Sequence, residues 1–259
     1  MSALFTVDDV CKTFGRGNNA VQAVKNVSFE IQPGTVTTLV GESGSGKSTM
    51  ARLMLRLMNV SSGTLTFDGR DITNTRGRER ADYWRNVQAV FQDPFSAYNQ
   101  FFTVRTMLNR SLKLVKDAAV GRKRMEESLA HVGMDSQVLN RYAHELSGGQ
   151  RQRIMIARAL MMQPRLLIAD EATSMLDASL RVNLLNVLAD LRQELGMTVF
   201  FITHDIGQAC YIADQVLVME HGVLVEHGPA EQVIFNPQHE YTQRLLSDVP
   251  RLQPTDQLG

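Results

Sequence analysis

Short apolar runs alternate with stretches of helical periodicity along most of this chain. Seven runs are short, rich in β-branched or apolar residues and mostly bounded by Gly, Pro or polar residues, as strands are. They span 4–10, 21–31, 35–40, 64–67, 87–91, 166–169 and 198–202. The first, second and fourth predict an antiparallel patch, and the almost wholly apolar last two are typical of buried parallel strands. Residues 215–220 and 222–225 predict a closing hairpin around His221 and Gly222.

Other stretches repeat apolar residues every three or four positions, which predicts helices. One such helix begins near Lys47, and its apolar positions are Met50, Leu53, Leu55 and Leu57. Another ends at Gly196, a common helix stop, and its apolar positions are Leu184, Leu188, Leu191 and Leu195. Between 93 and 163 the pattern is predominantly helical, with runs at 104–115 and 121–132.

These elements predict an α/β protein with a parallel sheet, an N-terminal antiparallel β patch and a helical insertion. We expect one domain over 1–259, with its core at 1–92 and 163–235, a helical subdomain at 93–162, and a C-terminal tail at 236–259. Neither an internal repeat nor a low-complexity linker interrupts this order.

Composition excludes several classes of protein. The formal net charge is +0 at pH 7, so no strong field favours nucleic acid or an anionic membrane. No apolar run is long enough to span a bilayer, and the first residues lack a signal-peptide pattern, so we expect a cytoplasmic protein. Cys11 and Cys210 are too few and too far apart in sequence for a disulfide framework or a zinc site.

Residues 41–48 fit the phosphate-loop pattern G-x-x-x-x-G-K-[ST] between a predicted strand and a predicted helix. The glycines let backbone N–H groups turn towards phosphate oxygens, and the helix N-terminus adds a partial positive charge. Lys47 is expected to reach the β- and γ-phosphates, and Ser48 to ligate Mg²⁺. The simpler alternative is a Gly/Ser turn with a chance lysine. The expected ATP-binding residues are Gly41, Glu42, Ser43, Gly44, Ser45, Gly46, Lys47, Ser48 and Thr49.

Two acids follow the buried strand at 166–169. A carboxylate at such a strand end, beside a phosphate loop, can organise Mg²⁺, and the next residue can direct a water at the γ-phosphate. We therefore assign Asp170 to the metal and Glu171 to general base or water positioning. The alternative, two acids that cap the following helix, is the minor interpretation.

A second candidate anion site lies at Leu146-Ser147-Gly148-Gly149-Gln150. Ser147 and Gln150 have the spacing of a helix capping box, so this segment could be only a well-capped helix start. Two glycines in a first turn cost helix stability, however, and suggest that another group approaches closely. The helix that follows has its apolar positions at Ile154, Ile156, Ala157, Leu160 and Met161.

Together these motifs resemble the ATP-binding cassette (ABC) ATPase family over nearly the whole chain. The resemblance implies a RecA-like P-loop NTPase core and the ABC nucleotide-binding fold. It implies that Ser147, Gly148, Gly149 and Gln150 act on ATP held by a facing subunit. It further implies that Gln92 contacts Mg²⁺ or the attacking water, that His204 senses the γ-phosphate, and that Asp177 lies near the dimer seam. Phe14 stands where an aromatic residue stacks on adenine, although a lone Phe near a terminus is usually a core residue.

Within this family the chain is similar to importer ATPases of the oligopeptide, dipeptide and nickel type, a branch that also serves oligosaccharide uptake. The residues that carry this similarity are 41–44, 91–94, 236–242 and Leu245-Leu246. It implies a second, non-identical ATPase subunit, two integral-membrane permeases, an extracytoplasmic solute-binding protein, and a place on the inner face of the membrane. Three departures stand out. Ala172 replaces a common proline, the loop 95–100 has an unusual sequence, and no cysteine follows Cys210, so we expect no iron–sulfur cluster.

Two alternatives remain open at this stage. The chain could be a soluble accessory ATPase, similar to the ABC protein of the carbon–phosphorus lyase system, or a regulatory subunit that binds nucleotide but scarcely hydrolyses it. The presence of Lys47, Asp170, Glu171 and His204 disfavours the regulatory alternative. The transported solute is not readable from this chain, because membrane subunits and a binding protein would select it.

Overall fold

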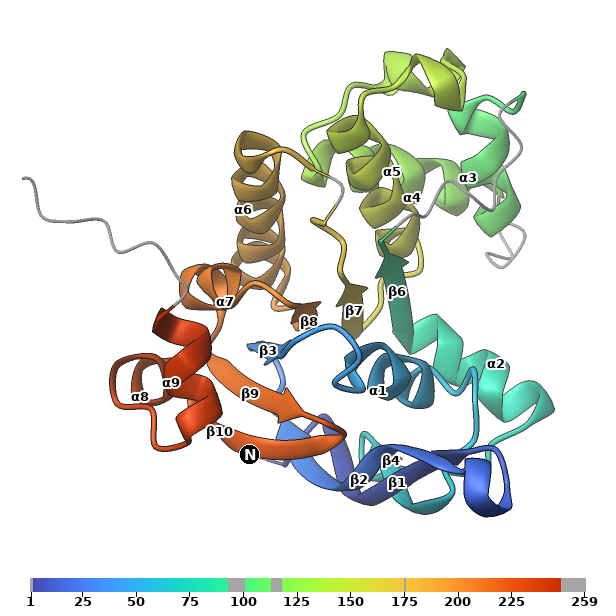
Figure 1. The fold of residues 1–259 in the computed structure, drawn as a ribbon. Helices are drawn as coiled ribbons and strands as arrows, with labels where there is room; N and C mark the ends of the chain where they lie inside the picture. The colour runs from blue at the N-terminus through green and yellow to red at the C-terminus, as the bar shows by residue number, and fades with distance from the viewer. Residues whose placement is uncertain (1, 93–100, 113–117, 175, 248–259) are drawn as a thin grey trace, which may run out of the picture.

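A computed structural model describes residues 2–92, 101–112, 118–174 and 176–247 (Figure 1). Its central sheet has six strands in the order β10-β9-β3-β8-β7-β6. Strands β9, β3, β8, β7 and β6 run parallel to their neighbours, and β10 is antiparallel at one edge. The strands are β3 Val36–Val40, β6 Val87–Phe91, β7 Leu166–Asp170, β8 Thr198–Thr203, β9 Gln215–Glu220 and β10 Val223–Pro229. The predicted parallel sheet and closing hairpin are therefore confirmed.

A second sheet of four antiparallel strands, in the order β2-β1-β4-β5, covers part of one face of the central sheet. The strands are β1 Phe5–Phe14, β2 Val21–Ile31, β4 Ser62–Phe67 and β5 Arg70–Asp71. This sheet lies at the bottom of Figure 1 and confirms the predicted antiparallel patch. Strand β1 continues beyond the predicted end at Val10 because its register with β2 extends to Phe14 opposite Val21.

Helices α3, α4 and α5 gather at the upper right of Figure 1 and form the predicted helical region. The helices of the described chain are α1 Lys47–Met54, α2 Gly77–Asn86, α3 Val104–Leu112, α4 Ala118–His131, α5 Gly148–Leu160, α6 Ala178–Leu195, α7 Ile206–Ile212, α8 Ala230–Phe235 and α9 Glu240–Ser247. As predicted, α6 stops at Gly196, which adopts a left-handed conformation with φ 62°.

Several details differ from the sequence-based expectation. Helix α1 ends at Met54, so Leu57 lies beyond it and is 57% exposed. Helix α2 was not predicted, because its only buried residue is Tyr83. The segment expected to be a tail contains α9, whose Tyr241 belongs to a buried cluster. Each short helix is stabilised by a few tertiary contacts rather than by a long apolar stripe.

Buried side chains form three clusters around the central sheet. One lies between the sheet and the helices α3–α6, and a second lies between the two sheets and includes residues of α1. The third lies between β9, β10 and the helices α7–α9. Both faces of β3, β7 and β8 are therefore covered, which explains why these strands read as continuous apolar runs.

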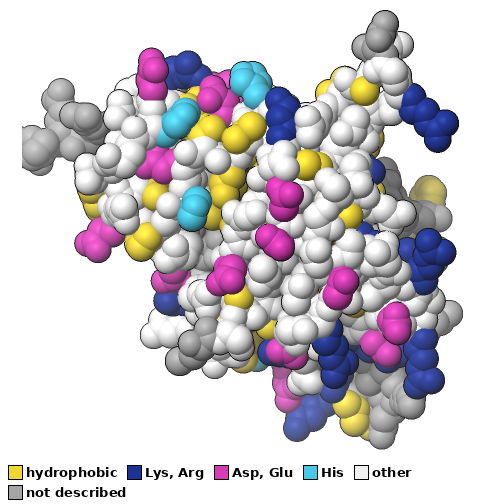
Figure 2. All heavy atoms as spheres, turned by 90° about the horizontal axis from the view of Figure 1, so that it is seen from below, with side chains coloured by type: hydrophobic (Ala, Val, Ile, Leu, Met, Phe, Trp, Pro, Cys, Tyr) yellow, Lys and Arg dark blue, Asp and Glu magenta, His cyan; other side chains and the backbone are white. Residues whose placement is uncertain are grey.

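The surface carries both signs of charge. Seen from below, acidic side chains extend across the molecule, whereas Lys and Arg lie mainly towards its right and lower edges (Figure 2). The apolar side chains on this view form small separate groups. Within the described residues, no helix combines the length and hydrophobicity required for a membrane span.

A candidate nucleotide site at the carboxyl ends of the central strands

The loop 41–46 connects β3 to α1 and follows the parallel strand at its carboxyl end. Gly41 has φ 153°, and a Cβ there would lie 2.1 Å from the carbonyl oxygen of Met219. Gly46 has φ 106°, and a Cβ there would lie 2.4 Å from the carbonyl oxygen of Ala23. Only glycine fits at either position, because any other side chain would collide with the neighbouring backbone. Strands β2 and β9 thus fix the loop from two sides.

Lys47 begins α1 and is almost fully buried, with 4% of its surface exposed. Its Nζ donates to the carbonyl oxygens of Gly41 at 2.8 Å and Glu42 at 2.7 Å, so the ammonium group is held over the loop. Burial lowers the pKa of Lys47, while the nearby carboxylates of Glu171 and Asp170 act in the opposite direction. A buried cation beside a cradle of backbone N–H groups is suited to phosphate binding.

Asp170 ends β7 and lies close to the first turn of α1. The Ser48 hydroxyl donates to Asp170 Oδ1 at 3.2 Å, which joins the two predicted Mg²⁺ ligands. A hydroxyl and a carboxylate are oxygen donors that suit Mg²⁺, and waters and phosphate oxygens commonly complete its coordination. No cluster of three or more His, Cys, Asp or Glu side chains able to hold a metal occurs among the described residues. The Ser48–Asp170 pair therefore fits a Mg²⁺ ion that arrives with a phosphate ligand.

Burial of Asp170 raises the pKa of its carboxyl group, although the hydrogen bond from Ser48 partly opposes this shift. The folded protein thus holds this proton more tightly than the unfolded chain does, and stability falls as pH rises through the folded pKa. We expect Asp170→Asn to raise the melting temperature of the nucleotide-free, Mg²⁺-free protein at neutral pH, because Asn removes the free-energy cost of burying an ionised carboxylate. The rise should be roughly 2–4 °C for each kcal/mol of that cost.

The gain should shrink as pH is lowered, because the wild-type carboxyl group is then neutral too. Thermal unfolding of both proteins across a pH series measures this difference. A lower melting temperature of Asp170→Asn at neutral pH would show that ionised Asp170 stabilises the fold.

Glu171 and His204 come from neighbouring strand ends and point at each other. Glu171 Oε2 lies 3.2 Å from His204 Nδ1, and the Glu171 side chain is 20% exposed. The Glu171 backbone is left-handed, with φ 50°, while its N–H donates to Ile202 O of β8 at 2.9 Å. A non-glycine residue in this region is strained and is often functional. Strands β7 and β8 thus place the Glu171 carboxylate beside the His204 imidazole at the carboxyl end of the sheet.

Gln92 lies just after β6 with its side chain exposed, and residues 93–100, including the unusual loop 95–100, fall outside the described part of the chain. Its carbonyl oxygen is 3.4 Å from Nε2 of Gln152, which also donates to Ala172 O at 2.6 Å. Gln152 is 3% exposed and connects α5 with the backbone next to Glu171. The sequence motifs assign no individual role to Gln152, a polar residue within an otherwise apolar helix face.

The capping box at the start of α5 is present. The N–H of Gln150 donates to Ser147 Oγ at 3.2 Å, and the N–H of Ser147 donates to Gln150 Oε1 at 3.1 Å. A Cβ on Gly149 would lie 3.0 Å from the Leu180 side chain, so the group that approaches this glycine belongs to the same chain. Gly148 has no such crowding, because a Cβ there would make an ordinary contact with Leu176. Ser147 itself is exposed at the helix N-terminus.

Phe14 is not a core residue, since 41% of its surface is exposed. It pairs with Val21 of β2, two residues before Ala23, whose carbonyl lies against Gly46. The ring therefore stands at the end of β1, on the strand next to β2, which borders the phosphate loop. The ammonium group of Lys12 lies 5.2 Å from its ring centroid. An exposed aromatic face in this place is available for stacking on a planar ring.

Asp177 caps α6, because its Oδ1 accepts hydrogen bonds from Leu180 N at 2.9 Å and Ser179 Oγ at 2.8 Å. These hydrogen bonds, led by that of Leu180, lower the pKa of Asp177. The side chain is exposed, so a capping role and a place near a subunit seam are compatible. Met175, in the same loop, lies outside the described residues.

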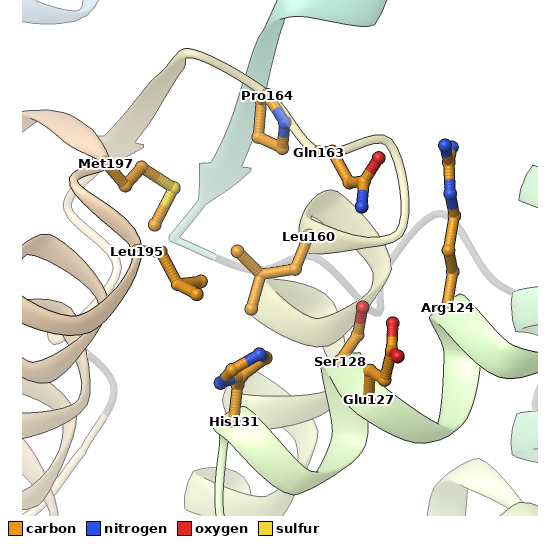
Figure 3. A pocket seen from close by; sticks show the side chains of 9 residues that line it. All are labelled: Arg124, Glu127, Ser128, His131, Leu160, Gln163, Pro164, Leu195 and Met197. Atoms are coloured by element: carbon orange, nitrogen blue, oxygen red, sulfur yellow. The ribbon is translucent and has the colours of Figure 1, made fainter.

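A separate hollow of about 270 Å³ lies between α4 and the beginnings of β7 and β8 (Figure 3). Polar side chains of α4 face an apolar wall in it. The residues around it are Arg124, Glu127, Ser128, His131, Leu160, Gln163, Pro164, Leu195 and Met197. None of them is a predicted site residue, and ligands of open α/β sheets bind at the opposite, carboxyl ends of the strands. The hollow is a junction between the helical region and the core.

Comparison with known proteins agrees with this geometry. A family model described as ABC transporter matches residues 24–174. The oligopeptide transport ATP-binding proteins OppF of Streptococcus mutans and AmiF of Streptococcus pneumoniae are each 43% identical to this chain over 97% of its length and 83% of theirs.

Solved structures give the same result. CbiO1 from Clostridium perfringens, part of the ABC transporter complex cbiONQ, superposes with a TM-score of 0.82 at 27% identity, over 97% of both chains. The ATP-binding cassette MJ0796, in a dimer bound to ADP and Pi, superposes with a TM-score of 0.76 at 27% identity, over 87% of this chain and 98% of that one.

Proposed function

Since this chain belongs to the ABC transporter family and carries a complete set of predicted catalytic groups, we propose that it is the ATP-hydrolysing subunit of a peptide importer. The observation that carries the proposal is the meeting of the phosphate loop, Asp170, Glu171 and His204 at one edge of the sheet. The similarity to oligopeptide transport ATP-binding proteins, over nearly the whole chain, supports the cargo class.

Each group has a role that follows from its position. The loop N–H groups and Lys47 bind the phosphates, and the exposed ring of Phe14 stacks on adenine. Ser48 and Asp170, with Gln92, would hold Mg²⁺, which neutralises charge on the phosphate oxygens when bound. Glu171 accepts a proton from, or orients, the water that attacks the γ-phosphate. His204 can donate its Nε2–H to the γ-phosphate, and in the imidazolium form its Nδ1–H also donates to the Glu171 carboxylate and holds it in place.

The exposed α5 N-terminus supports a paired mode of action. In the described residues, no hydrogen bond or ion pair joins Ser147–Gln150 to the phosphate loop of the same chain. We assign these residues to the ATP of a second, non-identical ATPase subunit, and Asp177 to the seam between the two subunits. A helix N-terminus is a favourable place for a γ-phosphate, and the Ser147 hydroxyl, whose oxygen accepts from Gln150 N–H, can donate its own proton to a phosphate oxygen. Hydrolysis then releases the two subunits from one another.

The proposal includes further partners. Two permease subunits would span the membrane, this chain would dock on them at the inner face, and a solute-binding protein would deliver the peptide from outside. Affinity purification of the tagged chain from detergent-solubilised membranes, followed by mass spectrometry, tests this arrangement. We expect a second ATPase subunit and two permeases to co-purify.

The assembled complex in vesicles should couple ATP hydrolysis to uptake of labelled peptides, and an oligosaccharide series is the comparison for the cargo class. Co-purification with soluble enzymes alone would favour the accessory ATPase, which the similarity to importer subunits disfavours. Turnover that stays negligible with the partner subunit present would favour a regulatory role.

A further inference from the structure

Helix α9 contacts the beginning of the phosphate loop from the other end of the chain. The Glu42 N–H donates to the hydroxyl oxygen of Tyr241 at 2.8 Å, across 199 positions of sequence. Arg244, one turn further along α9, has its guanidinium 5.1 Å from the centroid of the Tyr241 ring. Its Nη2 lies 3.8 Å from a Glu42 carboxylate oxygen and 3.6 Å from one of Glu220. The loop is thus linked to the last described helix of the chain.

Tyr241 has little freedom to move. It is 3% exposed and packs in the third buried cluster with Val40, the residue that precedes the phosphate loop. Helix α9 is itself fixed at its start, because the Glu226 carboxylate of β10 accepts the N–H groups of Gln238 at 2.7 Å and His239 at 3.0 Å. The Tyr241 hydroxyl is therefore held at a defined place beside the loop.

Tyr241 and Lys47 are hydrogen-bonded to opposite sides of the same peptide group. The Gly41 carbonyl and the Glu42 N–H belong to one planar unit. Tyr241 accepts from the N–H at one end of this unit, and Lys47 Nζ donates to the carbonyl at the other end, at 2.8 Å. A rotation of this peptide group would displace the acceptor that holds the Lys47 ammonium. The Tyr241 hydroxyl opposes that rotation.

We propose that Tyr241 is a positioning residue for ATP, which acts by fixing the Gly41–Glu42 peptide group that orients Lys47. Arg244 assists by pairing with the carboxylates of Glu42 and Glu220, which would otherwise repel the triphosphate. The Arg244 and Glu42 side chains are 60% and 63% exposed, and exposed ion pairs contribute little energy. The contribution of Arg244 to ATP binding is therefore small. The role of Tyr241 rests on the proposed function of the loop as the ATP site.

Tyr241→Phe tests the proposal because it removes the hydroxyl and keeps the buried ring. We expect the dissociation constant for MgATP, measured on the isolated chain by calorimetry, to rise roughly three- to tenfold, the effect of one hydrogen bond. The matched control is Tyr211→Phe, since Tyr211 lies 54% exposed on α7 and donates to Asn186 Oδ1 at 2.6 Å, away from the loop. This control should bind MgATP as the wild type does.

Thermal unfolding of each variant separates positioning from packing, with binding measured at a temperature at which all proteins are folded. An unchanged dissociation constant for Tyr241→Phe, with or without a lower melting temperature, would overturn the proposal. A Lys47→Ala variant that binds MgATP as tightly as the wild type would instead refute the loop as the ATP site, and the positioning role with it.

Discussion

Glu171→Gln is expected to slow ATP hydrolysis by about 100- to 10,000-fold, the usual contribution of a general base, while MgATP binding stays close to wild type. Gln has the shape of Glu but cannot accept a proton from water at neutral pH. The hydrogen bond with His204 Nδ1, now 3.2 Å from Glu171 Oε2, can persist with the amide oxygen. Loss of turnover would therefore report on chemistry rather than on a collapsed site.

The measurement is single-turnover hydrolysis in the presence of the partner ATPase subunit, together with equilibrium binding of MgATP. Glu194→Gln is a matched control, because Glu194 is also paired with a histidine, His131 at 3.9 Å, but lies on α6 outside the site. Rapid turnover by Glu171→Gln would contradict the assignment and direct attention to His204 and Gln92 as the groups that position water.

Lys47→Ala is expected to abolish measurable hydrolysis and to weaken MgATP binding by roughly 10- to 100-fold, the range for a lost charged hydrogen bond. The substitution removes the one buried ammonium group of the loop, which now donates to Gly41 O and Glu42 O. Since burial disfavours the charged form of Lys47, the substitution should not unfold the protein.

Hydrolysis and binding assays alongside thermal unfolding check this result. Lys123→Ala serves as the control, because Lys123 pairs with Glu127 at 3.7 Å and its side chain is 78% exposed on α4. If Lys47→Ala retained hydrolysis near the wild-type rate, 41–48 would be no more than a tight turn between β3 and α1.

The central strands could be predicted from the sequence because parallel strands covered on both faces are continuous apolar runs. Strand β3, for example, differs from its predicted range only at Thr35. Helix α2 could not be predicted, because its pattern is mostly charged. Two contacts with the end of α1 hold it: Tyr83 donates to Met54 O, and Trp84 Nε1 donates to Leu55 O at 2.7 Å. The spacing of residues 77–86 alone does not predict that Tyr83 and Trp84 bind the carbonyl oxygens of Met54 and Leu55.

In the candidate site, too, some residues could be predicted from the sequence and others could not. Motif spacing was sufficient to name Lys47, Asp170 and Glu171, because each follows a recognisable strand or loop. It could not reveal Gln152 or Tyr241, whose partners lie 60 and 199 positions away. Spacing also gave two interpretations of Ser147 and Gln150, and the capping hydrogen bonds show that the structural one is real. A role at a subunit interface would therefore depend on the groups of the α5 N-terminus that are still exposed, such as the Ser147 side chain.

The residues that enclose the phosphate loop have a consequence for biosynthesis. Several residues that contact the loop come from the last fifth of the sequence, among them Met219, Gly222 and Tyr241. The Gly222 N–H, for example, donates to Ser45 O at 2.9 Å. A ribosome makes the loop early and these neighbours last, and domains fold as synthesis proceeds. A nascent chain therefore has an incomplete enclosure of the phosphate loop until β9, β10 and α9 have emerged, so we expect ATP to bind only after these elements have been synthesised.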